Sequence, residues 1–223
     1  MDEQRLELKW TLLKEFVEIC DNNHIWYSLD KKLLLYAINN VEEEIEDDFE
    51  VMMTFESYEK LKTLHSKFVL DNCKHNLYHS QQIKFQKDCE NIEEEQPFIK
   101  INLLLPTKAV NVKKLFTTKY KMKNWACNLK LNSTVSHLIW NIPFFRWNYK
   151  QLINLIHEEI FEGFIVIGGT IDKAIKKTWI PNVNYQTKKV FYKNLYLKVF
   201  NEANVYLANI YDELLTKTSE EDN

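Results

Sequence analysis

An acidic run between residues 42 and 50 holds the side chains of this 223-residue chain that are best suited to chemistry. Seven of its nine residues are Asp or Glu. Asp48 and Glu50 are two positions apart, so on a strand their carboxylates share one face and can reach the same divalent ion. Oxygen ligands of this kind suit Mg²⁺ or Mn²⁺, which bridge phosphate oxygens in phosphoryl and nucleotidyl transfer. Asp47 would face the other way unless the strand begins after it. A solvated acidic turn is the commoner explanation of such a run.

The elements that position this run follow from apolar spacing and from capping signals. Residues 4–22 repeat apolar side chains at largely helical spacing, and "HIWYSL" (24–29) is typical of a short strand. Asp30 is placed to cap a helix over 31–38, which Asn39 and Asn40 end. After the acids, "FEVMM" (49–53) predicts a second strand, and Thr54 the cap of a helix over 55–68.

The rest of the chain predicts one mixed α/β domain over residues 1–216, followed by a frayed acidic tail over 217–223. No internal repeat and no linker rich in Pro, Gly or Ser divides it. The further expected elements are strands at 83–88 and at 98–105 (closed by Pro106), helix and loop over 107–130, a helix over 149–163 ended by Gly163, a hairpin over 190–200 and a last helix over 201–215.

Composition is that of an ordinary globular protein, with 45% hydrophobic and 27% charged residues. No run of 18 apolar residues exists, so no transmembrane segment is expected, and the charged N-terminus lacks a signal-peptide core. A cytoplasmic location is therefore expected. The cysteines are interpreted as reduced thiols. Cys73 and Cys89, with His75 and His79, match no common structural zinc pattern.

Two other groups of residues could contact a ligand. The segment 107–125 is basic and aromatic, and it could bind a polyanionic acceptor, a membrane surface or RNA, although a solvated helix explains it without a function. The net charge of −3 argues against nucleic acid as a partner. An aromatic cluster around Pro143 favours core packing first and contact with carbohydrate or choline second. That cluster consists of Trp140, Phe144, Phe145 and Trp147.

The order of these elements and their motifs resembles the LicD family, which includes the fukutin-type proteins. The signature of that family runs roughly L-D-G-G-T-L-L-G-A, then D-D-D-I-D, then M-P-x-x-D-Y-E-K-L. The matching positions here read "LDKKLLLYA" (29–37), "EDDFE" (46–50) and "MTFESYEKL" (53–61). Downstream, "FIKINLLLP" (98–106) is similar to the family segment I-D-I-F-P, and residues 187–215 are similar to its closing hairpin and helix. The resemblance thus covers nearly the whole chain, in order.

This resemblance implies a nucleotidyltransferase-like fold with a mixed sheet flanked by helices. It also implies transfer of a phosphoalcohol, such as phosphocholine or a polyol phosphate, from a CDP-linked donor to a cell-surface glycan. Carried over by position, Asp48 and Glu50 are the catalytic acids, and together with Asp47 they would hold Mg²⁺ or Mn²⁺ if the protein is active. The location would be cytoplasmic, at the membrane surface if the acceptor is held there.

The resemblance also implies a nucleotide-binding turn formed by Asp30, Lys31 and Lys32 just before and within the short helix. Lys87 belongs to a faint match with a basic strand motif of the family. Lysines at 31 and 32 replace the glycine pair of the signature, whose backbone N–H groups approach a phosphate without a Cβ in the way.

Two other departures affect the acids directly. Glu50 stands where the family has Asp, and Lys100 falls where the family carries an acid on the neighbouring strand. A lysine there offers no metal ligand, and its charge would compete with a metal for Asp48 and Glu50. Two hypotheses remain open: a divergent but working transferase, and a non-catalytic relative that binds a partner, such as another protein. For the fold, we expect the strand of Glu50 to lie beside the strand of Lys100, with Lys100 paired to Asp48 or Glu50.

Overall fold

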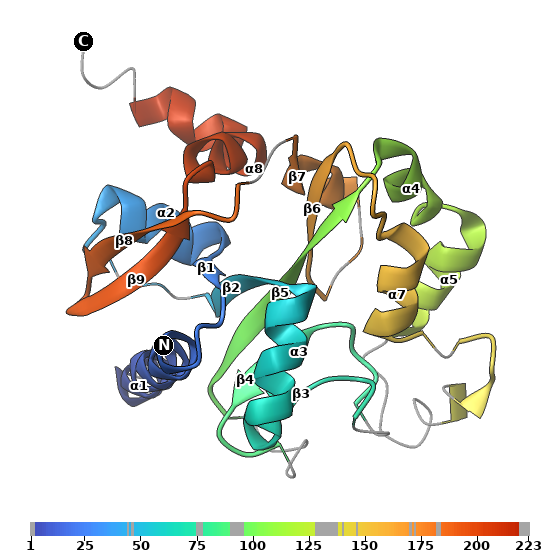
Figure 1. Cartoon of the computed structure of the whole chain (residues 1–223), viewed down its shortest axis with the longest axis horizontal. Coiled ribbons are helices and arrows are strands. Elements are labelled where there is room, and N and C mark those ends of the chain that lie inside the picture. Colours follow the sequence, from blue (N-terminus) through green and yellow to red (C-terminus); the bar gives the residue numbers. More distant parts are fainter. Residues whose placement is uncertain are drawn as a thin grey trace.

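The computed structural model describes residues 3–43, 45, 47–74, 78–89, 96–127, 138–139, 141–145, 147–169, 171, 173–181 and 184–218. A seven-stranded mixed sheet runs through the molecule, helices pack around it, and a separate two-stranded hairpin lies at one side (Figure 1). The predicted α/β class with a mixed sheet is confirmed. No helix within the described ranges is long and apolar enough to cross a membrane.

Strand β5 (Phe98–Thr107) organises this sheet. One of its edges pairs in parallel with β2 (Phe49–Thr54), and the register places Glu50 opposite Lys100. The expectation that these two strands lie side by side is therefore confirmed. The other edge of β5 is shared by two antiparallel strands, β4 (Ile83–Gln86) and β6 (Gly163–Ile167). Three short strands complete the sheet, namely β1 (Ser28–Leu29), β3 (Val69–Leu70) and β7 (Trp179–Ile180).

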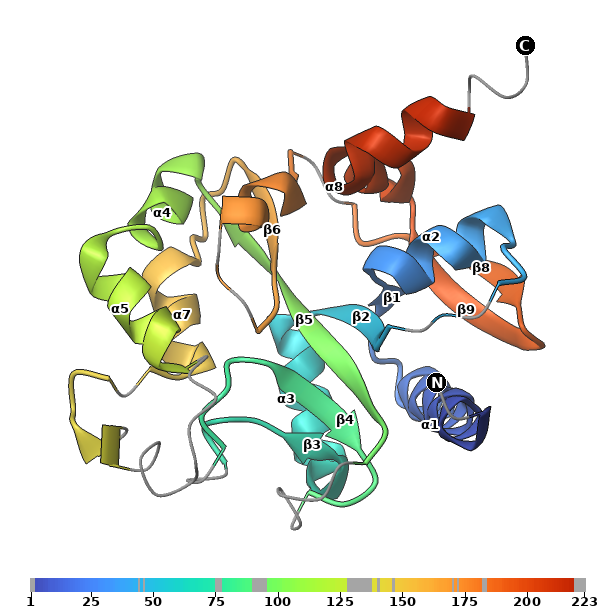
Figure 2. The ribbon, with the colours of Figure 1, turned by 180° about the vertical axis from the view of Figure 1, so that it is seen from behind.

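The shared edge of β5 is divided at Asn102. Strand β4 pairs with β5 as far as Ile101, and β6 pairs with it from Leu103 onward, so the two strands border opposite halves of β5 (Figure 2). Gln82 spans the division, because its Nε2 donates to Ile101 O (3.1 Å) and its Oε1 accepts from Gly169 N (3.0 Å). The side chain of Asn102 therefore lies where the sheet opens.

Most of the helices form where apolar spacing and caps predict them. Asp30 caps α2 by accepting from Lys31 N, and Thr54 caps α3 by accepting from Ser57 N. The helices are α1 (Glu3–Asn22), α2 (Lys31–Asn39), α3 (Phe55–Leu64), α4 (Ala109–Lys114), α5 (Thr118–Cys127), α7 (Tyr149–Ile156) and α8 (Ala203–Thr218), with 3₁₀ turns at Ser66–Phe68 and Lys173–Thr178. Residues 219–223 of the expected acidic tail lie outside the described part of the chain.

The predicted hairpin is present as β8 (Thr187–Tyr192) and β9 (Leu195–Phe200). Its turn residues, Lys193 and Asn194, have φ values of 46° and 62°, which is the pair of positive φ angles that a two-residue type I′ loop requires. All four cysteines are free thiols, as expected.

The helix predicted from Tyr149 to Gly163 is too long. It ends at Ile156, because the following backbone bonds to the end of the sheet instead: Glu158 N donates to Pro106 O (3.1 Å). Gly163 then begins strand β6 and does not end a helix. Long-range hydrogen bonds have replaced the helical continuation that apolar spacing favours.

Two strand boundaries also differ from the prediction. Strand β5 continues through Pro106 to Thr107, because the carbonyl of a proline still accepts a hydrogen bond even though its nitrogen cannot donate one. The strand expected over 24–29 is reduced to Ser28–Leu29, because the chain is still turning at His24, where φ is 51°.

Candidate functional site

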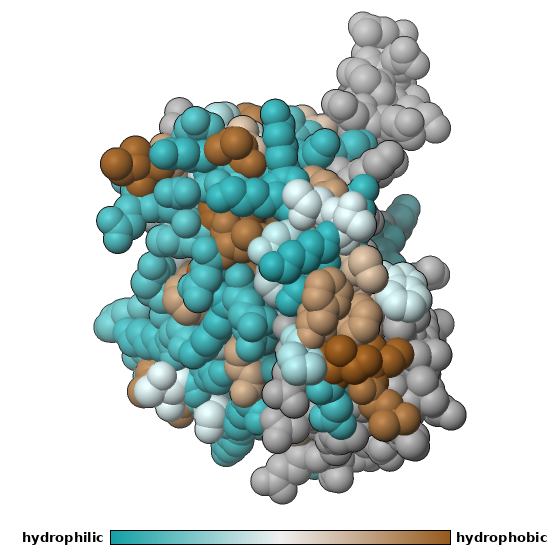
Figure 3. All heavy atoms as spheres, turned by 90° about the vertical axis from the view of Figure 1, so that its right-hand side faces the viewer, coloured by the Kyte–Doolittle hydropathy of each residue, from teal (hydrophilic) through white to brown (hydrophobic). Residues whose placement is uncertain are grey.

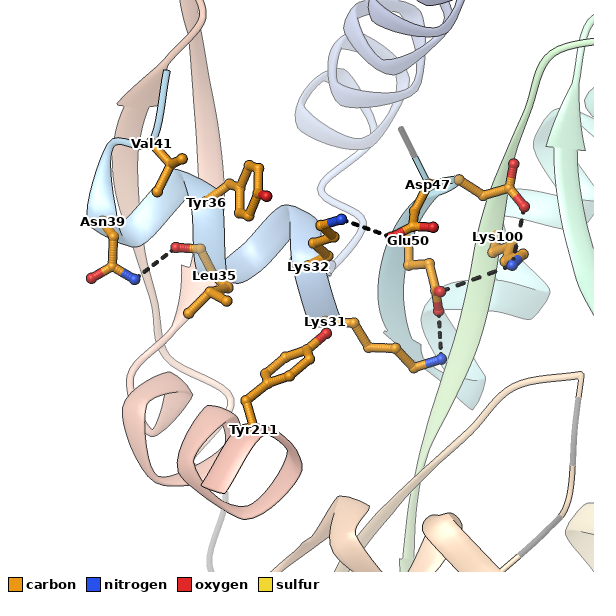
Figure 4. Close-up of a pocket in the computed structure, with 11 residues that line it drawn as sticks. Lys31, Lys32, Leu35, Tyr36, Asn39, Val41, Asp47, Glu50, Lys100 and Tyr211 are labelled. Atoms are coloured by element: carbon orange, nitrogen blue, oxygen red, sulfur yellow. Dashed lines mark hydrogen bonds and ion pairs between the residues drawn. The ribbon is translucent and has the colours of Figure 1, made fainter. Parts of the chain in front are cut away.

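A cleft of about 790 Å³ lies between α2, the start of β2, β5 and α8 (Figure 4). Its sheet side is charged, and its other side carries the rings and aliphatic chains of Leu35, Tyr36, Val41 and Tyr211. Eleven residues line it: Lys31, Lys32, Leu35, Tyr36, Asn39, Val41, Asp47, Asp48, Glu50, Lys100 and Tyr211. The lining therefore suits a ligand with one charged part and one flat or apolar part.

The three acids predicted as metal ligands all line this cleft. Glu50 is the second residue of β2, and Asp48 directly precedes that strand. Because β2 begins only at Phe49, the alternation of strand side chains does not turn Asp47 away from the cleft. Lys32 Nζ lies 3.0 Å from Asp47 Oδ2, and a dashed line marks this ion pair in Figure 4.

Lysines surround the carboxylates of Asp48 and Glu50. Lys100 Nζ lies 3.1 Å from Asp48 Oδ2 and 4.0 Å from Glu50 Oε1, which confirms the expected pairing. The remaining oxygens face Lys9 and Lys31, with 3.6 Å from Lys9 Nζ to Asp48 Oδ1 and 2.8 Å from Lys31 Nζ to Glu50 Oε2. The side chain of Lys100 is 30% exposed, so this cation is partly accessible to water.

A divalent ion does not fit this donor set. Each carboxylate oxygen of Asp48 and Glu50 has an ammonium group within 4.0 Å, so an ion would have to displace Lys100. At that separation a pair of unit charges interacts by about 4 kcal/mol at an effective dielectric of 20. Across the described ranges, no group of three or more His, Cys, Asp or Glu side chains is arranged to hold a metal. His75 of the cysteine-histidine cluster lies outside those ranges.

Behind the cleft, a buried network joins Asp30 to Glu50 through Asn102. The amide Nδ2 of Asn102 donates to Asp30 Oδ2 and to Glu50 Oε2, each at 2.7 Å. Tyr206 Oη, from α8, donates to Asp30 Oδ1 at 2.6 Å. Asp30 is fully buried, and this burial, together with the charge of Glu50, raises the pKa of Asp30. Asp30 was predicted to contact the nucleotide; it instead supports the cleft from beneath, because the fold uses both of its oxygens.

The oxygen of the same amide has no hydrogen-bond partner among the described residues. Asn102 is fully buried, and its Oδ1 accepts no hydrogen bond from any residue that the structure describes. It borders a second hollow of about 330 Å³ where the sheet divides, and Lys31 and Lys100 line both this hollow and the cleft. A Cβ on Gly168 would lie 2.4 Å from this oxygen, so a side chain at this position would force Asn102 to move. A ligand N–H or O–H in the hollow would satisfy Asn102.

Lys31 has an unusual backbone conformation. Its φ is 45°, in the left-handed region where glycine is favoured and where a Cβ costs about 1 to 2 kcal/mol. The preceding Asp30 N donates to Glu50 O (2.9 Å), which ties this turn to β2. Lys31 thus takes the backbone geometry of a glycine at a position where the LicD signature has glycine.

Lys87 does not line the cleft. It is exposed beyond the end of β4, where the alternation of strand side chains no longer directs it toward the acids. Its neighbour Lys84 lies on β4 opposite Lys100, and burial lowers the pKa of Lys84. Of the two lysines in "IKFQKD", the one nearer the acids is Lys84.

Sequence reasoning missed Lys9, Asn102, Tyr206 and Tyr211. Only Asn102 left a signal: a polar residue in the apolar run "INLLL", two positions after Lys100 and therefore on the same strand face. The others come from α1 and α8, far from the acids in sequence. No protein-family model matches this chain, and neither a curated protein nor a solved structure is detectably similar to it.

Proposed function

We propose that this protein is a LicD-like, non-catalytic member of the nucleotidyltransferase-type folds, with a cleft that binds a phosphorylated ligand through lysines. The observation that carries the proposal is the position of Lys100 Nζ, 3.1 Å from Asp48 and 4.0 Å from Glu50. Phosphoryl and nucleotidyl transfer rely on a divalent ion that bridges phosphate oxygens and leaving group. Here the ammonium groups of Lys9, Lys31 and Lys100 neutralise the two acids and supply no such bridge.

The ligand class follows from the charge balance of the lining. Three lysines face three acids within the cleft, so a strongly charged ligand gains little there, whereas a ligand that carries both signs can match both. A phosphoalcohol such as phosphocholine has this property, since its phosphate would bind Lys31 and Lys32, and its cation would lie against Tyr36 or Tyr211. We infer that the cleft binds a phosphoalcohol, free or linked to CDP.

The second candidate is the transferase that the family resemblance implies. It would use a CDP-linked donor, a cell-surface glycan as acceptor, and Mg²⁺ or Mn²⁺, on the cytoplasmic side at a membrane surface. The observations that favour it are the glycine-like φ of 45° at Lys31 and the retention of three acids in the cleft. This candidate requires that Lys100 leave Asp48 and Glu50.

One pair of measurements separates the two candidates. Calorimetric titration with CDP-choline, CDP-ribitol and CDP-glycerol in EDTA should detect binding of at least one ligand. This binding should weaken about tenfold in Lys31→Ala, since one charge-assisted contact is lost. Lys150→Ala serves as the matched control, because Lys150 is 53% exposed and pairs with Glu59 outside the cleft.

The same ligands with Mg²⁺ or Mn²⁺ should release no CMP above the level of Asp48→Asn. CMP release that disappears in Asp48→Asn would establish the transferase and overturn the non-catalytic proposal. Absence of binding to all three ligands in EDTA would overturn the proposed ligand class.

A further inference from the structure

One part of the chain has a charge opposite to that of the whole. Residues 96–157 contain no Asp or Glu and ten Lys or Arg residues, although the net charge of the chain is −3. This part includes α4, α5 and the turn around residues 141–145, which lie together on the side of the molecule away from the β8–β9 hairpin (Figure 1). A local excess of positive charge on one side favours an anionic partner there.

The outer face of α5 is both basic and apolar. Four exposed side chains of α5 lie at helical positions i, i+3, i+4 and i+7, so they form one stripe: Thr118, Lys121, Met122 and Trp125. Trp125 is 59% exposed, which is unusual for the largest apolar ring in a protein. The opposite face of α5 is buried against the rest of the protein.

A turn beside α5 also carries exposed apolar side chains. Leu138, Ile142 and Phe144 are exposed, and Leu138 is 63% exposed. Lys123, on the buried face of α5, has its Nζ 5.5 Å from the ring centroid of Phe144, so the turn lies beside this helix. Figure 3 shows apolar side chains gathered on this side of the molecule. Core packing, expected for the aromatic cluster, is correct for the buried Trp147 and wrong for Phe144, whereas Trp140 lies outside the described residues.

We propose that this face, formed by Lys121, Met122, Trp125, Leu138, Ile142 and Phe144, binds the surface of an anionic lipid bilayer. Exposed lysines at 113, 114 and 119 flank it. Lysines attract anionic headgroups, tryptophan favours the headgroup level, and aliphatic chains insert just below it. A nucleic acid would contact the lysines but would leave the aliphatic side chains in water. Lysines also outnumber arginines on this face, and arginine is the residue that most often reads bases. Lipid is therefore the better match. This inference does not depend on what the cleft binds.

Vesicle flotation tests the proposal with the full chain. The protein should float with vesicles of phosphatidylcholine and phosphatidylserine and not with phosphatidylcholine alone. High salt should weaken the association, and the emission of the tryptophans should shift to the blue on binding. The double variant Trp125→Ser with Ile142→Ser should bind about tenfold more weakly, because it removes the inserting side chains and keeps every charge.

The hairpin offers a matched control, because Tyr196 and Phe191 are exposed apolar rings on strands that also carry lysines. Tyr196→Ser with Phe191→Ser should bind vesicles like the wild type, and an unchanged circular dichroism spectrum should accompany both variants. Absence of flotation with anionic vesicles would overturn the proposal, as would equal losses in the two double variants. RNA binding that is lost in the first variant, without vesicle binding by the wild type, would assign the face to nucleic acid instead.

Discussion

Replacement of Lys100 by Met should destabilise the protein, because it leaves Asp48 and Glu50 without the cation between them. The distances of 3.1 Å and 4.0 Å correspond to about 4 to 5 kcal/mol of Coulomb energy for each pair at an effective dielectric of 20, before desolvation is subtracted. Lys100 is 30% and Glu50 14% exposed, so water solvates part of the charge that the substitution leaves unpaired. Both acids also keep a second lysine, so most of this Coulomb energy is not lost from the folded state. We expect a net loss of about 2 kcal/mol in the free energy of unfolding, or about 4 to 8 °C in Tm.

Lys100→Asp provides the sharper comparison. It brings a third carboxylate to the other two, so the loss without metal should reach about 4 kcal/mol. Three carboxylates form an oxygen site that suits Mg²⁺, and an ion present at a hundred times its Kd should restore about 2.7 kcal/mol. Thermal unfolding in EDTA and in Mg²⁺ measures both effects. Lys150→Met removes an exposed ion pair and should change the free energy of unfolding by less than about 0.5 kcal/mol in either buffer.

The wild type is the test of the reasoning. Its Tm should stay constant when Mg²⁺ or Mn²⁺ replaces EDTA, since an ion stabilises the native state only if it binds there. A wild-type protein stabilised by Mg²⁺, with the effect lost in Asp48→Asn, would show that the acids hold a metal beside Lys100. That result would refute both the electrostatic argument and the non-catalytic proposal.

Lys31→Gly should be more stable than Lys31→Ala by about 0.5 to 1 kcal/mol, as measured by chemical denaturation. Both variants lose the ion pair with Glu50, but only alanine keeps a Cβ at a φ of 45°. Equal stability of the two variants would contradict this reasoning. Burial raises the pKa of Asp30 above its ordinary value of 3.8, so its contribution to stability is complete below that value and is lost as the pH rises through the folded-state pKa. The free energy of unfolding of the wild type should therefore fall relative to that of Asp30→Asn as the pH rises from 3.8 through the folded-state pKa of Asp30. A difference that stays constant over this pH range would count against the raised pKa. Burial alone would raise the pKa of Asp71, but the hydrogen bond and charge of Lys62 help to hold it below 3.8. Lys62→Met should thus cost about 3 kcal/mol near neutral pH, and the cost should shrink as the pH falls through the folded-state pKa of Asp71; a cost independent of pH would argue against the ion pair.

The sequence by itself was sufficient for features that depend on residues near one another in the chain. The caps at Asp30 and Thr54 and the two-residue turn of the hairpin follow from local backbone preferences. Asp48 and Glu50 share one cation, as their spacing predicted, although β2 begins only at Phe49, so strand alternation does not itself place Asp48. The α/β class was also predictable from the order of strongly patterned elements, whereas the expectation that β2 and β5 are neighbours came from the family resemblance.

Only the tertiary structure decided how the acids are neutralised and supported. Lys9 reaches Asp48 from α1, and Tyr206 reaches Asp30 from α8, although neither has a local signal that marks it. The end of α7 at Ile156 was likewise set by bonds to the end of β5. These contacts depend on which strands pair and in what register, because the energy of a charge depends on the groups that replace its water, and the fold brings those groups from distant parts of the chain.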